Sequence, residues 1–215
     1  MILDFEARRG SSSFSIPLLK RIISNGFDPN QKVGACTTIL MMFVDRNLGE
    51  CVRYMWEVCD LNVHATDSDG FGIMHYAHQC DLDFLKFMVN TMAVPYNIIS
   101  KDGRNILWTS DWSSMALRCG NRKNEEEILD WMIDDLGIDP NPPKKECWKK
   151  ILHWYLNYAE PICLDRVKYW IEKRGLDPWE KDQNLHDAFY IAQKCGSDNP
   201  DLTNYFMSLQ TKNEV

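Results

Sequence analysis

The residues best suited to hold a metal ion lie in the segment His75-x-x-His78-x-Cys80. Histidines three residues apart can share one helix face, and imidazole and thiolate are the donors that Zn²⁺ prefers. Zinc needs four converging ligands, however, and no second closely spaced pair of such residues occurs in the sequence. The upstream donors that would have to complete a site are Cys51, Cys59 or His64. We therefore expect these residues to be structural, with no bound metal and no cofactor.

The sequence contains no residue pattern typical of a catalytic site. It has no Gly-x-Ser-x-Gly turn for a nucleophile, no phosphate-binding glycine loop and no glycine pattern of a dinucleotide fold. The carboxylates Glu125–Glu127 and Asp134-Asp135 occur in a segment with helical spacing. There a solvated charged face is the simpler interpretation, and acidic residues in a first turn favour the helix dipole. These features predict that the chain is not an enzyme.

Composition limits the classes of partner. The chain has 215 residues, 45% of them hydrophobic, and a net charge of -7. This length suits one large domain or two small ones. An acidic chain without a basic block is a poor polyanion binder, so we expect no nucleic-acid partner. The densest apolar run, residues 38–44, ends at Asp45 and Arg46. It falls short of the roughly 20 apolar residues of a membrane span, so none is expected.

The N-terminal residues and the cysteines suggest a location. No apolar core follows the basic pair Arg8-Arg9, so a secretory signal is not expected. The eight cysteines occur singly, without a Cys-x-x-Cys pair, which predicts buried thiols in a reducing compartment rather than a disulfide framework. We expect an intracellular, cytoplasmic protein. The basic pair and the run Ser11–Ser13 leave a mitochondrial location as the alternative.

Two short phrases alternate along the chain. The first combines a small residue with Asp, Pro or Asn after an amphipathic helical segment, and occurs at residues 26–30, 59–62, 94–97, 137–141 and 175–179. Its glycine suits a left-handed helix cap, and its proline stops the helix. The second has two apolar residues before a histidine or aromatic, and occurs at residues 38–41, 72–77, 105–108, 150–153 and 187–192. Such alternation at intervals of 32 to 44 residues indicates internal repeats.

These phrases resemble parts of an ankyrin repeat. The second is similar to the Thr-Pro-Leu-His start of the family's inner helix, most closely at residues 69–77, and the first to the exit from its outer helix. An intact Thr-Pro is never present, and a HEAT-like or irregular helical array is the competing architecture. The resemblance implies an all-α solenoid of stacked helix-turn-helix units joined by hairpin-like finger loops. It also implies that the rings of His75 and His153 tie helix starts to neighbouring loops.

The same resemblance implies one ankyrin-repeat domain over residues 1–210, followed by a tail at residues 211–215. The approximate units are residues 1–32, 33–67, 68–101, 102–143, 144–181 and 182–210. The fourth unit is longer than the others, which places an insertion near residues 112–123. Insertions of this kind map to loops, where they either bind a partner or form a bulge that the fold tolerates.

In an ankyrin array the finger tips and the exposed side of the inner helices form a concave surface. We expect a protein partner to bind there and at the insertion, because exposed aromatic side chains dominate interfaces. The expected contact residues are Phe71, Tyr76, Arg104, Trp112, Met115, Arg118, Arg122, Trp154 and Tyr158. The alternative for Trp154 and Tyr158 is that they pack between units as core.

Together these features predict a non-enzymatic protein–protein interaction module, a scaffold that binds a protein partner through the concave face and the fourth-unit insertion. The alternative is a structural accessory subunit of a large multiprotein assembly. A free module should be a monomer on its own, whereas a subunit with several covered patches should aggregate without its neighbours.

Overall fold

The computed structural model describes residues 15–33, 37–108, 125–141, 151–159, 162–182, 184–195 and 199–213. Almost all regular structure in these ranges is helical, and the only paired strands among them form one short hairpin. The predicted all-α class is therefore confirmed. By their contacts the residues divide into two compact units, Met1–Pro95 and Tyr96–Val215, and each is described by itself.

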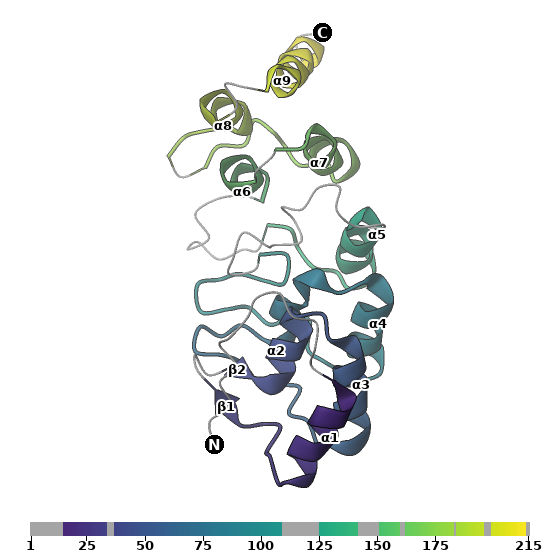
Figure 1. Ribbon diagram of the computed structural model, residues 1–215. Helices are drawn as coiled ribbons and strands as arrows, with labels where there is room; N and C mark the ends of the chain where they lie inside the picture. Colours follow the sequence, from purple (N-terminus) through teal and green to yellow (C-terminus); the bar gives the residue numbers. More distant parts are fainter. Residues whose placement is uncertain are drawn as a thin grey trace. The chain divides into compact units, whose positions relative to one another are not determined.

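The first unit has helices on two sides, joined by loops that reverse the chain (Figure 1). On one side, α2 (Ile39–Asp45) packs beside η1 (Ile73–Gln79), a short 3₁₀ helix. The helices on the other side are α1 (Ile16–Ser24), α3 (Gly49–Val58) and α4 (Leu82–Asn90). Short and long helices therefore alternate along the chain, in the order that the two phrases predict.

Loops with hairpin geometry precede the short helices of this unit. Strands β1 (Lys32–Val33) and β2 (Thr37–Thr38) pair antiparallel directly before α2. A single antiparallel bridge between Thr66 and Gly72 closes the corresponding loop before η1. Because the chain reverses within a few residues, each loop delivers the start of the next helix to the same side of the unit.

Caps start these helices where the polar residues predict. The Thr38 hydroxyl accepts a hydrogen bond from the Met41 amide at 3.3 Å, and Asp81 accepts one from the Phe84 amide at 2.8 Å. Each cap satisfies a backbone donor that the first helical turn leaves without a partner. Behind the caps lies a core of apolar side chains from every helix, including Leu19, Ile39, Met41, Val44, Val52, Met55, Ile73, Met74, Leu85 and Met88.

The second unit repeats this arrangement over its described residues. α6 (Ile151–Tyr158) packs against α8 (Ala188–Cys195), which in turn contacts α9 (Pro200–Asn213). α5 (Glu125–Asp130) and α7 (Leu164–Lys168) lie side by side, joined by an ion pair between Glu125 and Arg166. Figure 1 shows α5 and α7 on the side of the unit opposite α6 and α8.

Both of these outer helices end in a π-helical turn. η3 (Trp131–Asp135) continues α5, and its Leu136 amide donates to the Trp131 carbonyl. η4 (Tyr169–Lys173) continues α7, and its Arg174 amide donates to the Tyr169 carbonyl. In a π turn the hydrogen bond spans five residues, so the helix widens by one residue. The two turns occupy equivalent places, just before a glycine exit.

Three helix exits have the predicted left-handed glycine. Gly26, Gly137 and Gly175 have φ angles of +82°, +69° and +66°. A side chain is strained in this conformation, whereas glycine adopts it readily. The prediction that these glycines end the helices is confirmed.

Segments about one repeat length apart lie side by side in the first unit. The Asn30 side chain donates to the Asp60 carbonyl at 2.7 Å and accepts from the Asn62 amide at 2.8 Å. The Lys32 ammonium donates to the Thr66 carbonyl at 3.0 Å. These bonds span 30, 32 and 34 residues, so they fix successive loops to one another.

Bonds of the same span occur in the second unit. The Asn105 side chain donates through Nδ2 to the Asp139 carbonyl at 2.6 Å, and the Trp108 indole donates to the Pro140 carbonyl at 3.0 Å. His153 Nε2 donates to the His186 carbonyl at 3.1 Å. The spans are 34, 32 and 33 residues. The His153 bond is the predicted tie between a helix start and a neighbouring loop.

The cysteines only partly follow expectation. Cys51 and Cys80 are buried free thiols, and Cys59 is a partly exposed one. The expectation of thiols throughout is wrong for Cys163, which is disulfide-bonded. No helix in the described ranges combines the length and apolarity that a membrane crossing needs.

Candidate functional site

The residues considered for a metal site hold the first unit together instead. His75 Nδ1 accepts a hydrogen bond from the Gly72 amide at 3.1 Å, which caps the start of η1. The Cys80 thiol donates to the Val44 carbonyl at 3.6 Å. His78 Nδ1 lies 3.8 Å from the Asp45 carboxylate. The described residues contain no group of three such side chains that could hold a metal ion, and His75, His78 and Cys80 each have a structural contact.

We therefore expect no stoichiometric zinc in the purified protein, and no change of Tm on addition of EDTA. The reason is that a structural zinc contributes many kcal/mol to folding, so its removal would be plain in a melting curve. Elemental analysis together with differential scanning fluorimetry checks this prediction. One tightly held zinc ion per chain would overturn the assignment of His75, His78 and Cys80 as structural residues.

One predicted contact residue of the first unit is not exposed. Phe71 is buried, with its ring 5.0 Å from that of His75, so its expected exposure at a finger tip is wrong. The cause is the loop itself, because Asp67 Oδ1 accepts the amides of Asp69 and Phe71 and thereby turns the Phe71 ring inward. Tyr76 is half-buried, and its hydroxyl donates to Asp67 Oδ2 at 2.6 Å.

In the second unit, Arg104 is partly exposed and its guanidinium Nε lies 2.7 Å from the Asp102 carboxylate. The pair belongs to a loop closed by the Ser100 amide, which donates to the Arg104 carbonyl at 2.8 Å. The other predicted contact residues before α6 are Trp112, Met115, Arg118 and Arg122, and they lie outside the described residues together with the predicted insertion at residues 112–123.

An aromatic row lies along α6. The Trp154 ring is 5.3 Å from that of Trp108 and 5.8 Å from that of Tyr158. Trp108 is buried, whereas Trp154 and Tyr158 are half-buried. Both side chains therefore pack in part and keep part of their surface exposed, so they are not fully buried core residues, and their contact with a partner stays a prediction. Asn157 lies on the same helix face, between them in sequence.

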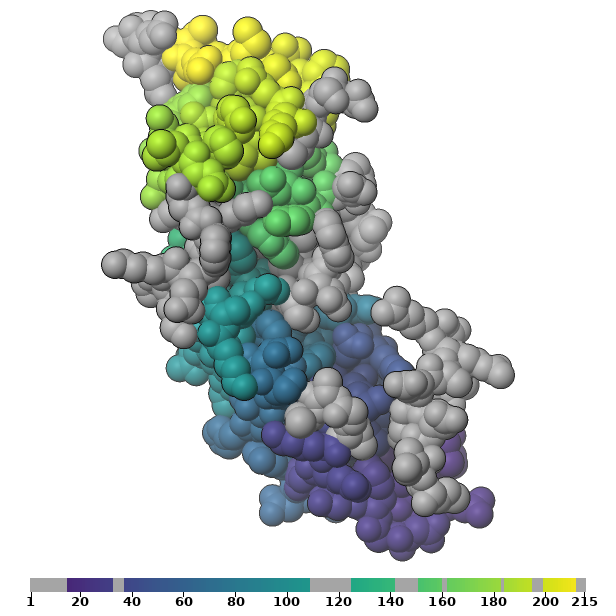
Figure 2. Space-filling model, turned by 90° about the vertical axis from the view of Figure 1, so that its left-hand side faces the viewer, coloured from purple at the N-terminus to yellow at the C-terminus, as the bar shows by residue number. Residues whose placement is uncertain are grey.

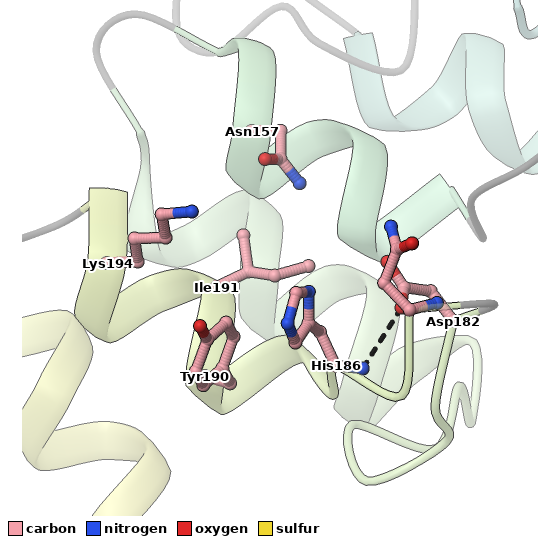
Figure 3. A pocket seen from close by; sticks show the side chains of 7 residues that line it. Asn157, Asp182, His186, Tyr190, Ile191 and Lys194 are labelled. Carbon is pink, nitrogen blue, oxygen red and sulfur yellow. Dashed lines mark hydrogen bonds between the residues drawn. The ribbon is translucent and has the colours of Figure 1, made fainter.

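A pocket of about 170 Å³ adjoins this row. Asn157 of α6 lies at one wall, Asp182 and His186 come from the loop before α8, and Tyr190, Ile191 and Lys194 come from α8 (Figure 3). Figure 2 views the molecule from the side on which Figure 1 draws α6 and α8, and their green and yellow-green surface is continuous there. We call the aromatic row and the pocket together the α6–α8 face.

A buried carboxylate forms one wall of the pocket. Asp182 is 7% exposed, and its Oδ1 accepts the amides of Asn184 at 2.8 Å and His186 at 3.0 Å. Its Oδ2 is buried without a hydrogen-bond partner among the described residues. The His186 ring stacks on Tyr190 with 4.1 Å between ring centres and 14° between planes. Leu185, beside them, is 75% exposed and has a left-handed φ of +65°.

His153 is hydrogen-bonded to the loop that carries two of the pocket residues, through the His186 carbonyl. Burial lowers the pKa of its imidazole from the usual 6.5, although the His186 carbonyl and the Asp182 and Glu180 carboxylates oppose the shift. The ring is therefore held neutral, with the proton on Nε2 that the bond to the His186 carbonyl requires. A buried neutral histidine makes the loop sensitive to acid.

We expect the wild-type protein to lose stability as the pH falls below about 6.5, the pKa of an unfolded histidine. In that range the unfolded state binds a proton that the folded state refuses, so the free energy of unfolding falls, by at most about 1.4 kcal/mol per pH unit. Urea unfolding between pH 7.5 and pH 5.5 measures this slope. His153→Gln keeps a donor for the His186 carbonyl and should flatten the slope. An equal slope in both proteins would contradict the prediction.

The carboxylates of α5 and η3 lie mostly on an exposed face, as predicted, since Glu126, Glu127, Asp134 and Asp135 are exposed. Glu125 is only 10% exposed and lies 3.0 Å from Arg166, so its predicted exposure is wrong. Lys173 binds Asp130 at 2.7 Å, and Arg174 binds Asp130 as well. Burial alone would raise the pKa of Asp130, but hydrogen bonds from Lys173 and Tyr169 and the charge of Arg174 hold it below its usual value. These groups fasten α7 and η4 to α5.

Sequence reasoning missed the pocket-lining residues Asp182, His186, Tyr190 and Lys194. A signal was present, because Asp182 and His186 have the same spacing as Asp67 and Phe71. Comparison with known protein families finds no match to this chain, and comparison with curated proteins finds no relative.

Proposed function

We propose that this chain is a non-enzymatic protein-binding module of the ankyrin-repeat type, and that its partner binds the α6–α8 face. Support for the repeat type comes from the alternation of short and long helices and from the left-handed glycine exits. The loop-to-loop hydrogen bonds spanning 30 to 34 residues inside each unit support it as well. A period near 33 residues with hairpin loops before the inner helices is typical of ankyrin repeats.

The observation that carries the binding proposal is the half-buried aromatic row. Trp154 and Tyr158 already pack against each other and Trp108, so their orientations are largely fixed before a partner arrives. Prearranged aromatic side chains lose little conformational entropy on binding, and such residues dominate interface hot spots. The chain has a net charge of -7, and its sequence contains no block of basic residues. Nucleic-acid binding depends on such residues, so a protein is the better candidate for the partner.

The proposed location of the module is the cell interior, in the cytoplasm. The free thiols of Cys51, Cys59 and Cys80 support a reducing compartment. The disulfide at Cys163 counts against it, because disulfides are rare there. The mitochondrion stays the alternative.

The test begins with capture of the partner from the native cell and then measures the affinity of that partner for purified variants. We expect the double substitution Trp154→Ala, Tyr158→Ala to weaken binding at least tenfold, because it removes two aromatic anchors from one patch. Trp56→Ala is the matched control, since it removes a half-buried tryptophan from α3 in the first unit. Equal affinity of the double variant and the wild type would refute the proposed face.

The second candidate function is a structural subunit of a multiprotein assembly. It is favoured by large apolar side chains that stay exposed on several elements, namely Leu18, Val58, Ile99, Leu185 and Met207. A subunit of this kind should aggregate when produced without its neighbours. A stable monomer in size-exclusion chromatography would favour the free module.

A further inference from the structure

Three loops of this chain close in the same way. The amides of Asp67, Ser100 and Asp182 donate to the carbonyls of Phe71, Arg104 and His186, at 3.0, 2.8 and 2.8 Å. In each loop a side-chain oxygen of the first residue accepts the amide four residues later, at 2.9 Å from Asp67, 2.9 Å from Ser100 and 3.0 Å from Asp182. The loops at Asp67 and Asp182 also share the bond from the amide two residues later.

The two aspartate loops differ in whether the second carboxylate oxygen, Oδ2, accepts a hydrogen bond. Tyr76, nine residues after Asp67, donates its hydroxyl to Asp67 Oδ2 at 2.6 Å. The residue nine positions after Asp182 is Ile191, which has no donor. Asp182 Oδ2 is buried and has no hydrogen-bond partner in the described part of the chain. Ile191 and Asp182 both line the pocket, so the pocket lies where the tyrosine of the first unit would have its counterpart.

An unsatisfied buried carboxylate oxygen is costly, and it marks a place where a donor is missing. A cationic donor satisfies it best, because hydrogen bonds to charged groups are about twice as strong as neutral ones. The stacked rings of His186 and Tyr190 line the same pocket, and Tyr190 is 44% exposed. The face of an aromatic ring attracts a cation. With a volume of about 170 Å³ the pocket is smaller than sites for drug-sized ligands and suits a single side chain.

We propose that this pocket receives one basic side chain, lysine or arginine, of the protein partner, and that Asp182 binds its charged end. This inference rests on the proposed function, since it names the chemistry that the partner presents beside the aromatic row. The pocket makes Asp182 a specificity-determining residue, and Ile191 leaves the space that the partner's side chain fills. Because Asp182 Oδ2 is buried in the free protein, binding requires a local movement that exposes it to the incoming group.

Lys194 allows an experiment to distinguish a basic ligand from an acidic one. It lines the same pocket, and Figure 3 shows it on the side away from Asp182. A basic ligand is repelled by Lys194, whereas an acidic ligand would require it. Removal of Lys194 and removal of the Asp182 charge therefore have opposite effects on a basic ligand.

The experiment titrates the uniformly ¹⁵N-labelled full chain with Nα-acetyl-arginine amide and Nα-acetyl-lysine amide and follows amide chemical shifts. Nα-acetyl-norleucine amide is the uncharged control, and Nα-acetyl-glutamate amide the acidic one. We expect saturable shifts at His186 and Tyr190 with a basic probe only, with Kd values near 1 mM for an isolated side chain. No saturable shift with either basic probe up to about 10 mM would overturn the proposal.

Variants then assign the shifts to the pocket. Asp182→Asn should weaken the basic probe at least tenfold, Lys194→Ala should leave its affinity equal or higher, and Asp67→Asn is the matched control without effect. Ile191→Tyr should place a hydroxyl on Asp182, abolish probe binding and raise Tm. Saturable shifts with the glutamate probe that disappear in Lys194→Ala and persist in Asp182→Asn would overturn the proposal and show that the pocket takes an anionic ligand. If the Trp154→Ala, Tyr158→Ala protein loses the partner while Asp182→Asn binds it with unchanged affinity, the proposed function stands and this inference fails.

Discussion

Replacing Arg166 with alanine is expected to lower the free energy of unfolding by about 3–5 kcal/mol, because it leaves a buried charge without its partner. The Arg166 guanidinium is 4% exposed and lies 3.0 Å from Glu125, which is 10% exposed. Neither group can regain water without disrupting the contact between α5 and α7. Urea unfolding at pH 7, monitored by circular dichroism, gives the change.

Two further variants distinguish the effect of an unpaired buried charge from the effect of losing an exposed charge. The double substitution Glu125→Leu, Arg166→Met replaces the pair with apolar groups and should recover most of the loss, since a buried ion pair is often no better than a packed apolar one. Lys173→Ala removes a 48% exposed cation from the same side of the unit and should cost no more than about 1 kcal/mol. The explanation would be contradicted if the double variant lost as much free energy of unfolding as Glu125→Leu and Arg166→Met lose together.

The second large effect is expected at Trp170. Its side chain is fully buried, and its ring packs edge-on against Tyr169 at 5.0 Å. Replacement by alanine should cost about 3–5 kcal/mol, from lost burial and from the cavity that remains. Because the Trp170 indole nitrogen has no hydrogen-bond partner among the described residues, Trp170→Phe loses packing alone and should cost less than half as much.

Chemical denaturation measures this series as well. Met207→Ala on α9 is the control, because this side chain is 53% exposed and its loss should change stability by no more than about 0.5 kcal/mol. Comparable costs for Trp170→Ala and Met207→Ala would mean that η4 does not pack as described.

The helices and their exits were predictable because their signals are local. Gly137 and Gly175 precede Asp-Pro in sequence, and both have the left-handed conformation that this position needs. Thr38 is a polar residue before an apolar run, and it caps α2. The tie from His153 to a neighbouring loop was predictable in kind from the repeated phrase, and the bond to the His186 carbonyl confirms it.

The surface could not be predicted in the same way, because it depends on which side chains and backbone groups pair with one another, both within a loop and between segments far apart in sequence. Phe71 faces inward owing to the bonds that Asp67 makes around the loop. Glu125 is buried by Arg166, which lies 41 positions away. The pocket at Asp182 arises from what Ile191 lacks, and no single residue signals it. The sequence pattern therefore predicted which residues form elements, but not which of their faces stay open.

The paired π turns bear on how the lengths of α5 and α7 can change. Each of η3 and η4 holds one residue more than an α turn would, and each lies directly before its exit glycine. Deleting that residue would let the turn close as an ordinary α turn, because the wide turn already absorbs the extra residue and the flanking turns keep their phase. Asp130, which precedes the turn in α5, would keep its contact with Arg174. A change of length by one residue is therefore best tolerated at these two turns, close to the exit glycines.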